Sequence, residues 1–117
     1  MDKRKLAGRG GEAQAAAYLR SRGYELLGMN YACRAGEIDI IAARDGFVAF
    51  VEVKLRADAR FAQAREAVTP AKQRRIKLAA LEWLSTRECE LQPRFDVIEI
   101  YTRPGEDRII HLENAFE

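Results

Sequence analysis

The sequence predicts an α/β domain in which helices pack on a mixed β-sheet. Two adjacent runs rich in Ile, Val and Phe are joined by Asp45-Gly46, a dipeptide typical of tight hairpin turns. A helix-start signal, Thr69-Pro70, follows them, and two further strand-like runs come after it. The expected order is therefore helix, three strands, helix, two strands. At 117 residues the chain has room for one domain, which we expect to span residues 1–117.

Local signals justify each element in turn. Apolar residues at helical spacing predict a first helix over residues 11–22, closed by Gly23. Thr69 as N-cap and Pro70 as first helical residue predict a second helix that ends near Leu84. Runs of β-branched and aromatic residues predict five strands, at 24–32, 37–43, 47–56, 95–101 and 108–112, the last two joined by a turn at Pro104-Gly105.

Composition excludes several classes of protein. Hydrophobic residues make up 48% of the chain, enough to bury a core, but the longest apolar runs are too short to span a membrane. No signal-peptide pattern follows the basic N-terminus, so we expect a cytoplasmic protein without a membrane partner. Cys33 and Cys89 are too far apart for a zinc site, and His111 is the one histidine. Any metal would therefore be a hard cation held by carboxylates, such as Mg²⁺ or Mn²⁺.

The charges are distributed unevenly along the chain. Residues 1–34 carry seven Lys or Arg against three Asp or Glu, and residues 55–87 carry eight against three. Residues 88–117 reverse the balance, with three basic and eight acidic residues. A polyanion can bind across the two basic segments because each contact with a phosphate releases counterions. A solvated surface without a partner is the alternative.

The predicted hairpin brings charged residues together. With Asp45-Gly46 as a two-residue turn, the strand register opposes charged side chains in two pairs, Asp39 with Glu52 and Glu37 with Lys54. Two opposed carboxylates repel each other, the more so where apolar neighbours exclude water. A folded protein tolerates the pair if one carboxylate is protonated, if a cation lies nearby, or if both bind a divalent metal.

Lys54 and Arg56 extend this charged pattern along the second hairpin strand. With Glu52 they replace apolar residues on a face that begins with Val48 and Phe50. Functional sites are expected where a pattern is broken in this way. A strand whose end emerges into solvent is the alternative interpretation.

The two helices offer further candidates. Glu12 lies on the apolar stripe of the first helix, where it is either another metal ligand or a carboxylate that stabilises the helix dipole. Lys72 and the free amides at the start of the second helix can meet a phosphate. Arg74 and Arg75 beside it suit contacts with a nucleic-acid backbone, although a solvated face is an alternative for each.

Two segments resemble a known catalytic core. Gly36-Glu37-Ile38-Asp39-Ile40-Ile41-Ala42 and Phe50-Val51-Glu52-Val53-Lys54-Leu55-Arg56 look like the D…ExK core of the restriction-endonuclease-like, or PD-(D/E)xK, nuclease superfamily. More narrowly, nearly the whole chain resembles the YraN-like family of small bacterial proteins, from Gly11-Glu12 through Lys72-Gln73 to Asn114-Ala115-Phe116. The chain departs from the superfamily pattern at Ile38, where that pattern has a proline that carries no chemistry.

The resemblance implies a restriction-endonuclease-like fold and a set of site residues. It implies that the metal ligands are Asp39, Glu52 and the carbonyl of Val53, with Lys54 as the catalytic lysine. Similarity to archaeal Holliday-junction resolvases further implies that Glu12 joins the metal site. The residues expected to contact substrate are Arg56, Lys72, Gln73, Arg74 and Arg75.

Three hypotheses of function follow. The first is a Mg²⁺- or Mn²⁺-dependent nuclease that cleaves DNA or RNA, with DNA favoured as the substrate, and selects its substrate by structure. A homodimer is one way to cover a branched substrate. The second is a catalytically idle nucleic-acid-binding module that acts with other proteins in DNA processing. The third is a scaffold in which the charged pair only stabilises the hairpin.

Overall fold

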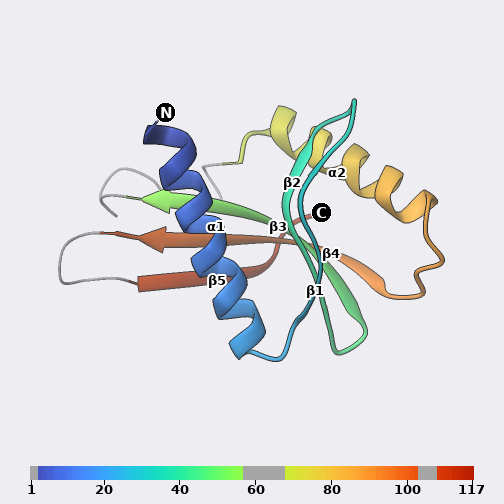
Figure 1. The fold of residues 1–117 in the computed structure, drawn as a ribbon. Coiled ribbons are helices and arrows are strands. Elements are labelled where there is room, and N and C mark those ends of the chain that lie inside the picture. The colour runs from blue at the N-terminus through green and yellow to red at the C-terminus, as the bar shows by residue number, and fades with distance from the viewer. Residues whose placement is uncertain (1–2, 57–67, 103–107) are drawn as a thin grey trace.

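The computed structural model describes residues 3–56, 68–102 and 108–117. The elements follow in the predicted order, two helices and five strands (Figure 1): α1 (Lys3–Ser21), β1 (Glu25–Ala32), β2 (Glu37–Arg44), β3 (Phe47–Arg56), α2 (Pro70–Ser85), β4 (Gln92–Tyr101) and β5 (Arg108–Phe116). The strands form one sheet in the order β1-β2-β3-β4-β5. Only β3 and β4 are parallel, and the other neighbours are antiparallel. The predicted α/β architecture with a mixed sheet is confirmed.

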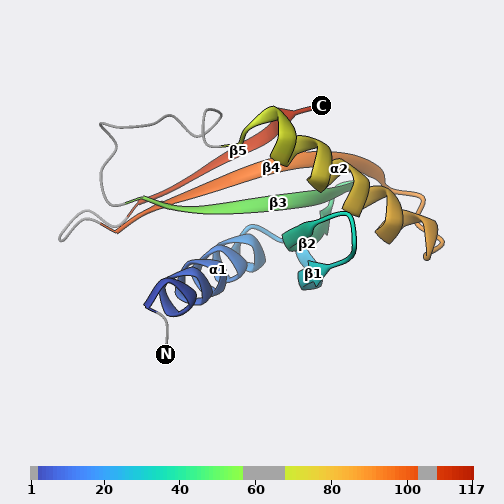
Figure 2. The ribbon, with the colours of Figure 1, turned by 90° about the horizontal axis from the view of Figure 1, so that it is seen from above.

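The two helices cover opposite faces of the sheet (Figure 2). The predicted stripe of α2 is buried against one face in a core that we call the α2-side core, where Trp83 meets Phe50 edge to face at 5.7 Å between ring centroids. The predicted stripe of α1, Ala15, Ala16 and Leu19, is buried in a second core on the other face, the α1-side core. Burial of these apolar faces removes them from water and fixes both helices on the sheet.

Local signals correctly predict where α1 ends and where α2 begins. Gly23 has φ +86° and closes α1, with its amide bonded to the Arg20 carbonyl and the Tyr24 amide bonded to the Leu19 carbonyl. The Thr69 side chain caps α2 and Pro70 is its first residue. The predicted start of α1 at residue 11 is wrong, because the helix begins at Lys3. The glycines around residues 8–11 have low helix propensity and hid this early start.

The last two strands are longer than predicted. β4 begins at Gln92 instead of residue 95, and β5 continues to Phe116 instead of residue 112. Pro93 and Asn114 caused both errors, since each is typical of breaks in strands. Tertiary pairing overrides these propensities: Pro93 pairs with β3, and an irregularity in the β4–β5 pairing accommodates Asn114 at φ 52°. The predicted turn at 104–105 lies outside the described residues.

A buried polar network joins β4 to β5. Asp96 is fully buried, and its oxygens accept hydrogen bonds from Arg94 (2.9 Å to each oxygen) and from the Asn114 amide (3.0 Å). The His111 Nε2 lies 2.7 Å from the same carboxylate. Burial alone would raise the pKa of Asp96, but the hydrogen bonds from His111 and Arg94 outweigh it and lower this pKa. His111 and Asp96 are thus engaged in holding the fold together.

Two of the predicted exclusions can be compared with the structure. In the segments that the structure covers, neither helix is long and apolar enough to cross a membrane. Cys33 and Cys89 are free thiols, and both are half-buried.

Candidate metal and phosphate site

The predicted register of the hairpin is confirmed over its paired part, which runs from Arg44 opposite Phe47 to Ile40 opposite Val51. The predicted continuation of this pairing is wrong. Within the described strands the β2–β3 pairing ends at Ile40, so Asp39 does not pair with Glu52, nor Glu37 with Lys54. The two strands instead separate at Asp39.

The cause of the separation is a change in side-chain alternation along β2. Ile38 and Ile41 both lie in the α2-side core, whereas Ile40 lies in the α1-side core. A regular strand would place Ile38 and Ile40 on the same face. The Asp39 carboxylate takes the place of a backbone acceptor, and its Oδ2 accepts the Val53 amide at 2.8 Å. We call the opening between Asp39 and Val53, where β2 leaves β3, the fork.

The fork also orients the backbone of Val53. The N–H and C=O of one strand residue point to the same side of the strand, as the paired hydrogen bonds of antiparallel strands require. Because the Val53 amide faces Asp39, the Val53 carbonyl is directed toward the fork as well. The role of that carbonyl as a metal ligand stays a prediction.

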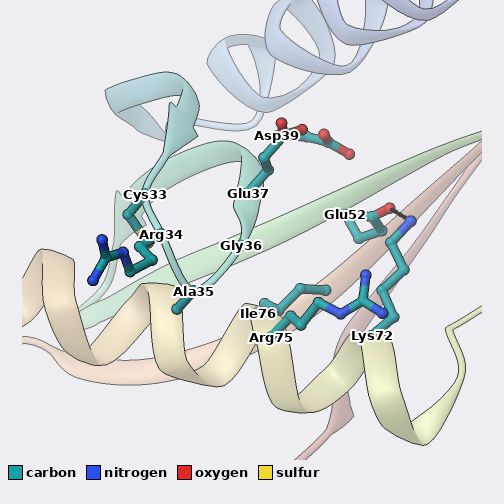
Figure 3. A pocket seen from close by; sticks show the side chains of 10 residues that line it. All are labelled: Cys33, Arg34, Ala35, Gly36, Glu37, Asp39, Glu52, Lys72, Arg75 and Ile76. Atoms are coloured by element: carbon teal, nitrogen blue, oxygen red, sulfur yellow. Dashed lines mark ion pairs between the residues drawn. The ribbon is translucent and has the colours of Figure 1, made fainter.

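Glu52 lies beside the fork and is almost fully buried, with 6% of its surface exposed. Its Oε1 pairs with the ammonium of Lys54 at 3.3 Å. It also pairs with the ammonium of Lys72 at 2.5 Å (Figure 3). Burial lowers the pKa of Lys54, and the adjacent Lys72 lowers it further. For Lys72, burial alone would lower the pKa, but the bond to Glu52 outweighs it and the pKa is raised. The two lysines therefore neutralise a carboxylate that would otherwise be an isolated buried charge.

Asp39 has no such cation in contact among the described side chains. Burial raises the pKa of Asp39 to about 7, the negative charge of Glu52 contributes to the rise, and the Val53 amide offsets only part of it. The charge of Glu12 raises this pKa slightly further. The arrangement favours a proton or a metal ion on Asp39, as is typical of carboxylates at functional sites.

A pocket of about 400 Å³ opens at these carboxylates. Its walls differ in charge: Glu37 and Asp39 lie across from Lys72 and Arg75, which rise from α2, and Glu52 lies between the two groups (Figure 3). A phosphate with a bound cation is a ligand that suits such a pair of walls.

The connection between β1 and β2 forms another wall that the sequence analysis missed. Cys33, Arg34, Ala35 and Gly36 all line the pocket. Gly36 lies so close to α2 that an added Cβ would stand 3.0 Å from both Cβ and the carbonyl oxygen of Arg75. The glycine was visible in the sequence, but its contact with a helix some forty residues away was not.

Glu12 is half-buried on α1, well beyond the first turn of the helix. The dipole interpretation is therefore wrong, since the helix dipole acts within the first turn. α1 packs on the sheet face opposite to α2 (Figure 2), and the charge of Glu12 on α1 acts on Asp39. Among the residues placed by the structure, no three His, Cys, Asp or Glu side chains are grouped so as to hold a metal. Glu12 influences Asp39, but it does not complete a three-carboxylate site.

The residues predicted to contact substrate divide into two groups. Lys72 and Arg75 line the pocket, whereas Arg56, Gln73 and Arg74 do not. The Gln73 side chain donates to the Val68 carbonyl at 2.9 Å, and the Lys72 amide donates to the Thr69 hydroxyl at 3.2 Å. The expectation that free amides lie at the start of α2 is thus wrong for Lys72, whose amide is capped.

Arg56 contacts an acidic residue outside the pocket. Its Nε lies 3.4 Å from Oε2 of Glu99, which is 3% exposed and also accepts the Tyr101 hydroxyl at 3.0 Å. Lys54 and Glu99 occupy paired positions on the parallel strands β3 and β4. Sequence reasoning missed Glu99 because that pairing is set only when β4 joins the sheet.

Comparison with known proteins places the chain in a family. Residues 11–100 match the model of "Uncharacterised protein family UPF0102". A UPF0102 protein of Geobacter sulfurreducens is 45% identical over 115 residues, which cover 97% of this chain and 90% of the relative. A UPF0102 protein of Syntrophomonas wolfei is 43% identical over 107 residues, which cover 91% of this chain and 93% of the relative. A UPF0102 protein of Caldanaerobacter subterraneus is 41% identical over 117 residues, which cover 97% of this chain and 96% of the relative. The chain belongs to the uncharacterised protein family UPF0102.

Proposed function

We propose that this protein is a metal-dependent nuclease of the PD-(D/E)xK type that hydrolyses phosphodiester bonds in DNA, in preference to RNA, in the cytoplasm. The observation that carries the proposal is the fork, where Asp39 and Glu52 meet beside two lysines. The resemblance of the segments around Asp39 and Glu52 to the D…ExK core supports the same function.

The donor atoms at the fork fit Mg²⁺ or Mn²⁺. Both ions prefer oxygen ligands, and Mg²⁺ is usually held by one or two carboxylates while water and substrate phosphate complete its shell. Asp39 and Glu52 supply the carboxylates and the Val53 carbonyl points the same way. The raised pKa of Asp39 indicates that a bound cation would stabilise the ionised form of this carboxylate.

Each residue has a role in hydrolysis under this proposal. A divalent metal here would lower the pKa of a bound water and stabilise charge on the phosphate. Lys54, held beside Glu52, would orient the attacking water through its ammonium. Arg75 and Lys72 on the opposite wall would hold the phosphate against the carboxylates. Selection by DNA structure follows from a pocket that contacts backbone and not bases, and a homodimer would present two such pockets to a branched substrate.

One observation favours the second candidate, a nucleic-acid-binding module without catalysis. The two lysines already neutralise Glu52, so this carboxylate is satisfied without a metal. Such a module would bind nucleic acid equally well with Mn²⁺ or EDTA, whereas the nuclease requires the metal.

A cleavage panel distinguishes the two candidates. The protein is mixed with a four-way junction, a flap, single-stranded DNA and single-stranded RNA, each with Mg²⁺, Mn²⁺ or EDTA. We expect metal-dependent cleavage of at least one DNA substrate, and a loss of about a hundredfold or more in Glu52→Gln and Lys54→Ala, because each removes a transition-state contact.

Glu113→Gln, prepared in parallel, is the matched control for a contaminating nuclease. Glu113 is an exposed carboxylate outside the pocket, and this variant should cleave as the unmodified protein does. No cleavage of any substrate with either metal, or equal cleavage by all variants, would contradict the proposal.

A further inference from the structure

Glu52 presents a conflict between the present contacts and metal binding. Its Oε1 is engaged by the ammonium groups of both Lys54 and Lys72. A carboxylate oxygen surrounded by two ammonium groups cannot also receive a divalent cation without strong like-charge repulsion, because few water molecules screen a residue that is 6% exposed. One of the lysines must therefore move when a cation binds.

Lys72 is the lysine that can leave. Lys54 lies on the same strand as Glu52, two residues away, and its side chain is 22% exposed. Lys72 reaches Glu52 from another element, the first turn of α2, and its side chain is 39% exposed and borders the open pocket. A long flexible lysine chain at the mouth of a pocket can exchange its partner for water or phosphate without any backbone movement.

We propose that Lys72 is a built-in counter-ion of Glu52 that competes with the divalent metal, so that metal binding requires its displacement from the carboxylate. Lys72 thus acts on the metal through Glu52, in addition to its proposed contact with the phosphate, and this inference rests on the proposed metal-dependent function. In the metal-free protein the Lys72 ammonium pairs with the Glu52 carboxylate and holds it in place. It sets the metal affinity below what Asp39 and Glu52 would give alone.

The test is Mn²⁺ binding measured by isothermal titration calorimetry on the unmodified protein, Lys72→Met and Lys72→Arg. We expect Lys72→Met to bind Mn²⁺ about tenfold more tightly, because a positive charge beside the carboxylate is removed. Lys72→Arg keeps a cation near Glu52 and should restore an affinity close to that of the unmodified protein.

Two further variants make the measurement specific. Lys77→Met removes one positive charge from the same helix away from the pocket, and should change the Mn²⁺ affinity less than about twofold. Asp39→Asn combined with Lys72→Met should abolish the gain. The cap of α2 uses the backbone amide of residue 72, so Lys72→Met should retain the fold, which thermal unfolding by circular dichroism checks.

The outcomes separate this inference from the proposed function. The unmodified protein could bind Mn²⁺ through Asp39 while Lys72→Met binds it no more tightly than Lys77→Met does. In that case the inference that Lys72 competes with the metal is wrong, and the nuclease proposal stands. If Lys72→Met still increases the Mn²⁺ affinity when Asp39 is replaced, the inference that Lys72 competes with the metal is also wrong. If neither the unmodified protein nor Lys72→Met binds Mn²⁺, both proposals fail.

Discussion

Asp39, which is half-buried, and Asp96, which is fully buried, have pKa values shifted in opposite directions. Asp96 receives hydrogen bonds from charged and neutral donors, and these lower its pKa. Asp39 receives one amide and faces the negative charge of Glu52, so its pKa rises. A carboxylate with a full set of donors stabilises a fold, whereas one placed against another carboxylate is available for a cation. The contrast supports a structural role for Asp96 and is consistent with the proposed metal-binding role of Asp39.

The raised pKa of Asp39 predicts a pH-dependent gain in stability for Asp39→Asn in the absence of metal. The folded-state pKa, about 7, lies above the ordinary value of 3.8. The contribution of Asp39 to the stability of the unmodified protein therefore falls between about pH 4 and pH 7 and then levels off, because deprotonation of Asp39 is harder in the folded state. Urea unfolding in EDTA should find Asp39→Asn more stable by about 1–3 kcal/mol at pH 8, with little difference near pH 4.

Asp45→Asn is the matched control for this measurement. Asp45 lies in the hairpin turn with 80% of its side chain exposed, and Asn tolerates its positive φ of 51°. We expect a change below about 0.5 kcal/mol at either pH. A variant Asp39→Asn that is less stable than the unmodified protein at pH 8 would show that Asp39 has a counter-ion in the folded state.

At the scale of elements, the site depends on how the connection between β1 and β2 meets α2. Because Gly36 has no Cβ, its backbone approaches α2 closely, and the connection then closes one wall of the pocket. On the other side, the capped start of α2 fixes Lys72 next to Glu52. The pocket is therefore assembled from elements that meet only in the folded chain.

Gly36→Ala should widen this pocket. The new Cβ would stand 3.0 Å from backbone and side-chain atoms of Arg75, so the connection must shift from α2. We expect a loss of about 1–2 kcal/mol in the free energy of unfolding and a loss of cleavage or DNA binding. Gly28→Ala is the control, since its Cβ would lie 3.7 Å from Ile41, an ordinary contact. Equal effects of the two substitutions on DNA binding would contradict this account.

At the scale of the whole molecule, the two faces of the sheet differ in what their helices contribute. α1 closes one face with small side chains, while α2 carries Lys72 and Arg75 to the pocket on the other. The chain has a formal net charge of only +2, so the arrangement of charges and not their sum decides where a polyanion binds.

This arrangement predicts that salt weakens nucleic-acid binding through the α2 side of the molecule. The association constant for single-stranded DNA is measured at several NaCl concentrations, and its logarithm is plotted against the logarithm of the NaCl concentration. Arg75→Gln should reduce the magnitude of the slope by about 0.7, which is the contribution of one phosphate contact. Arg20→Gln, an exposed charge on α1, should leave the slope unchanged. Fluorescence anisotropy measures both, and equal slopes for the two variants would place the DNA elsewhere.

The sequence by itself determined the order of elements, the apolar stripes of both helices and the hairpin register near Asp45-Gly46, because these follow from local propensities and short spacings. It also identified the candidates Asp39, Glu52 and Lys54, through the resemblance of their motif. Only the tertiary structure decided that β2 leaves β3 at Asp39, that Lys72 reaches Glu52 and that Gly36 touches α2. Such contacts join residues far apart in the chain, and their geometry depends on how whole elements pack, which no local pattern encodes.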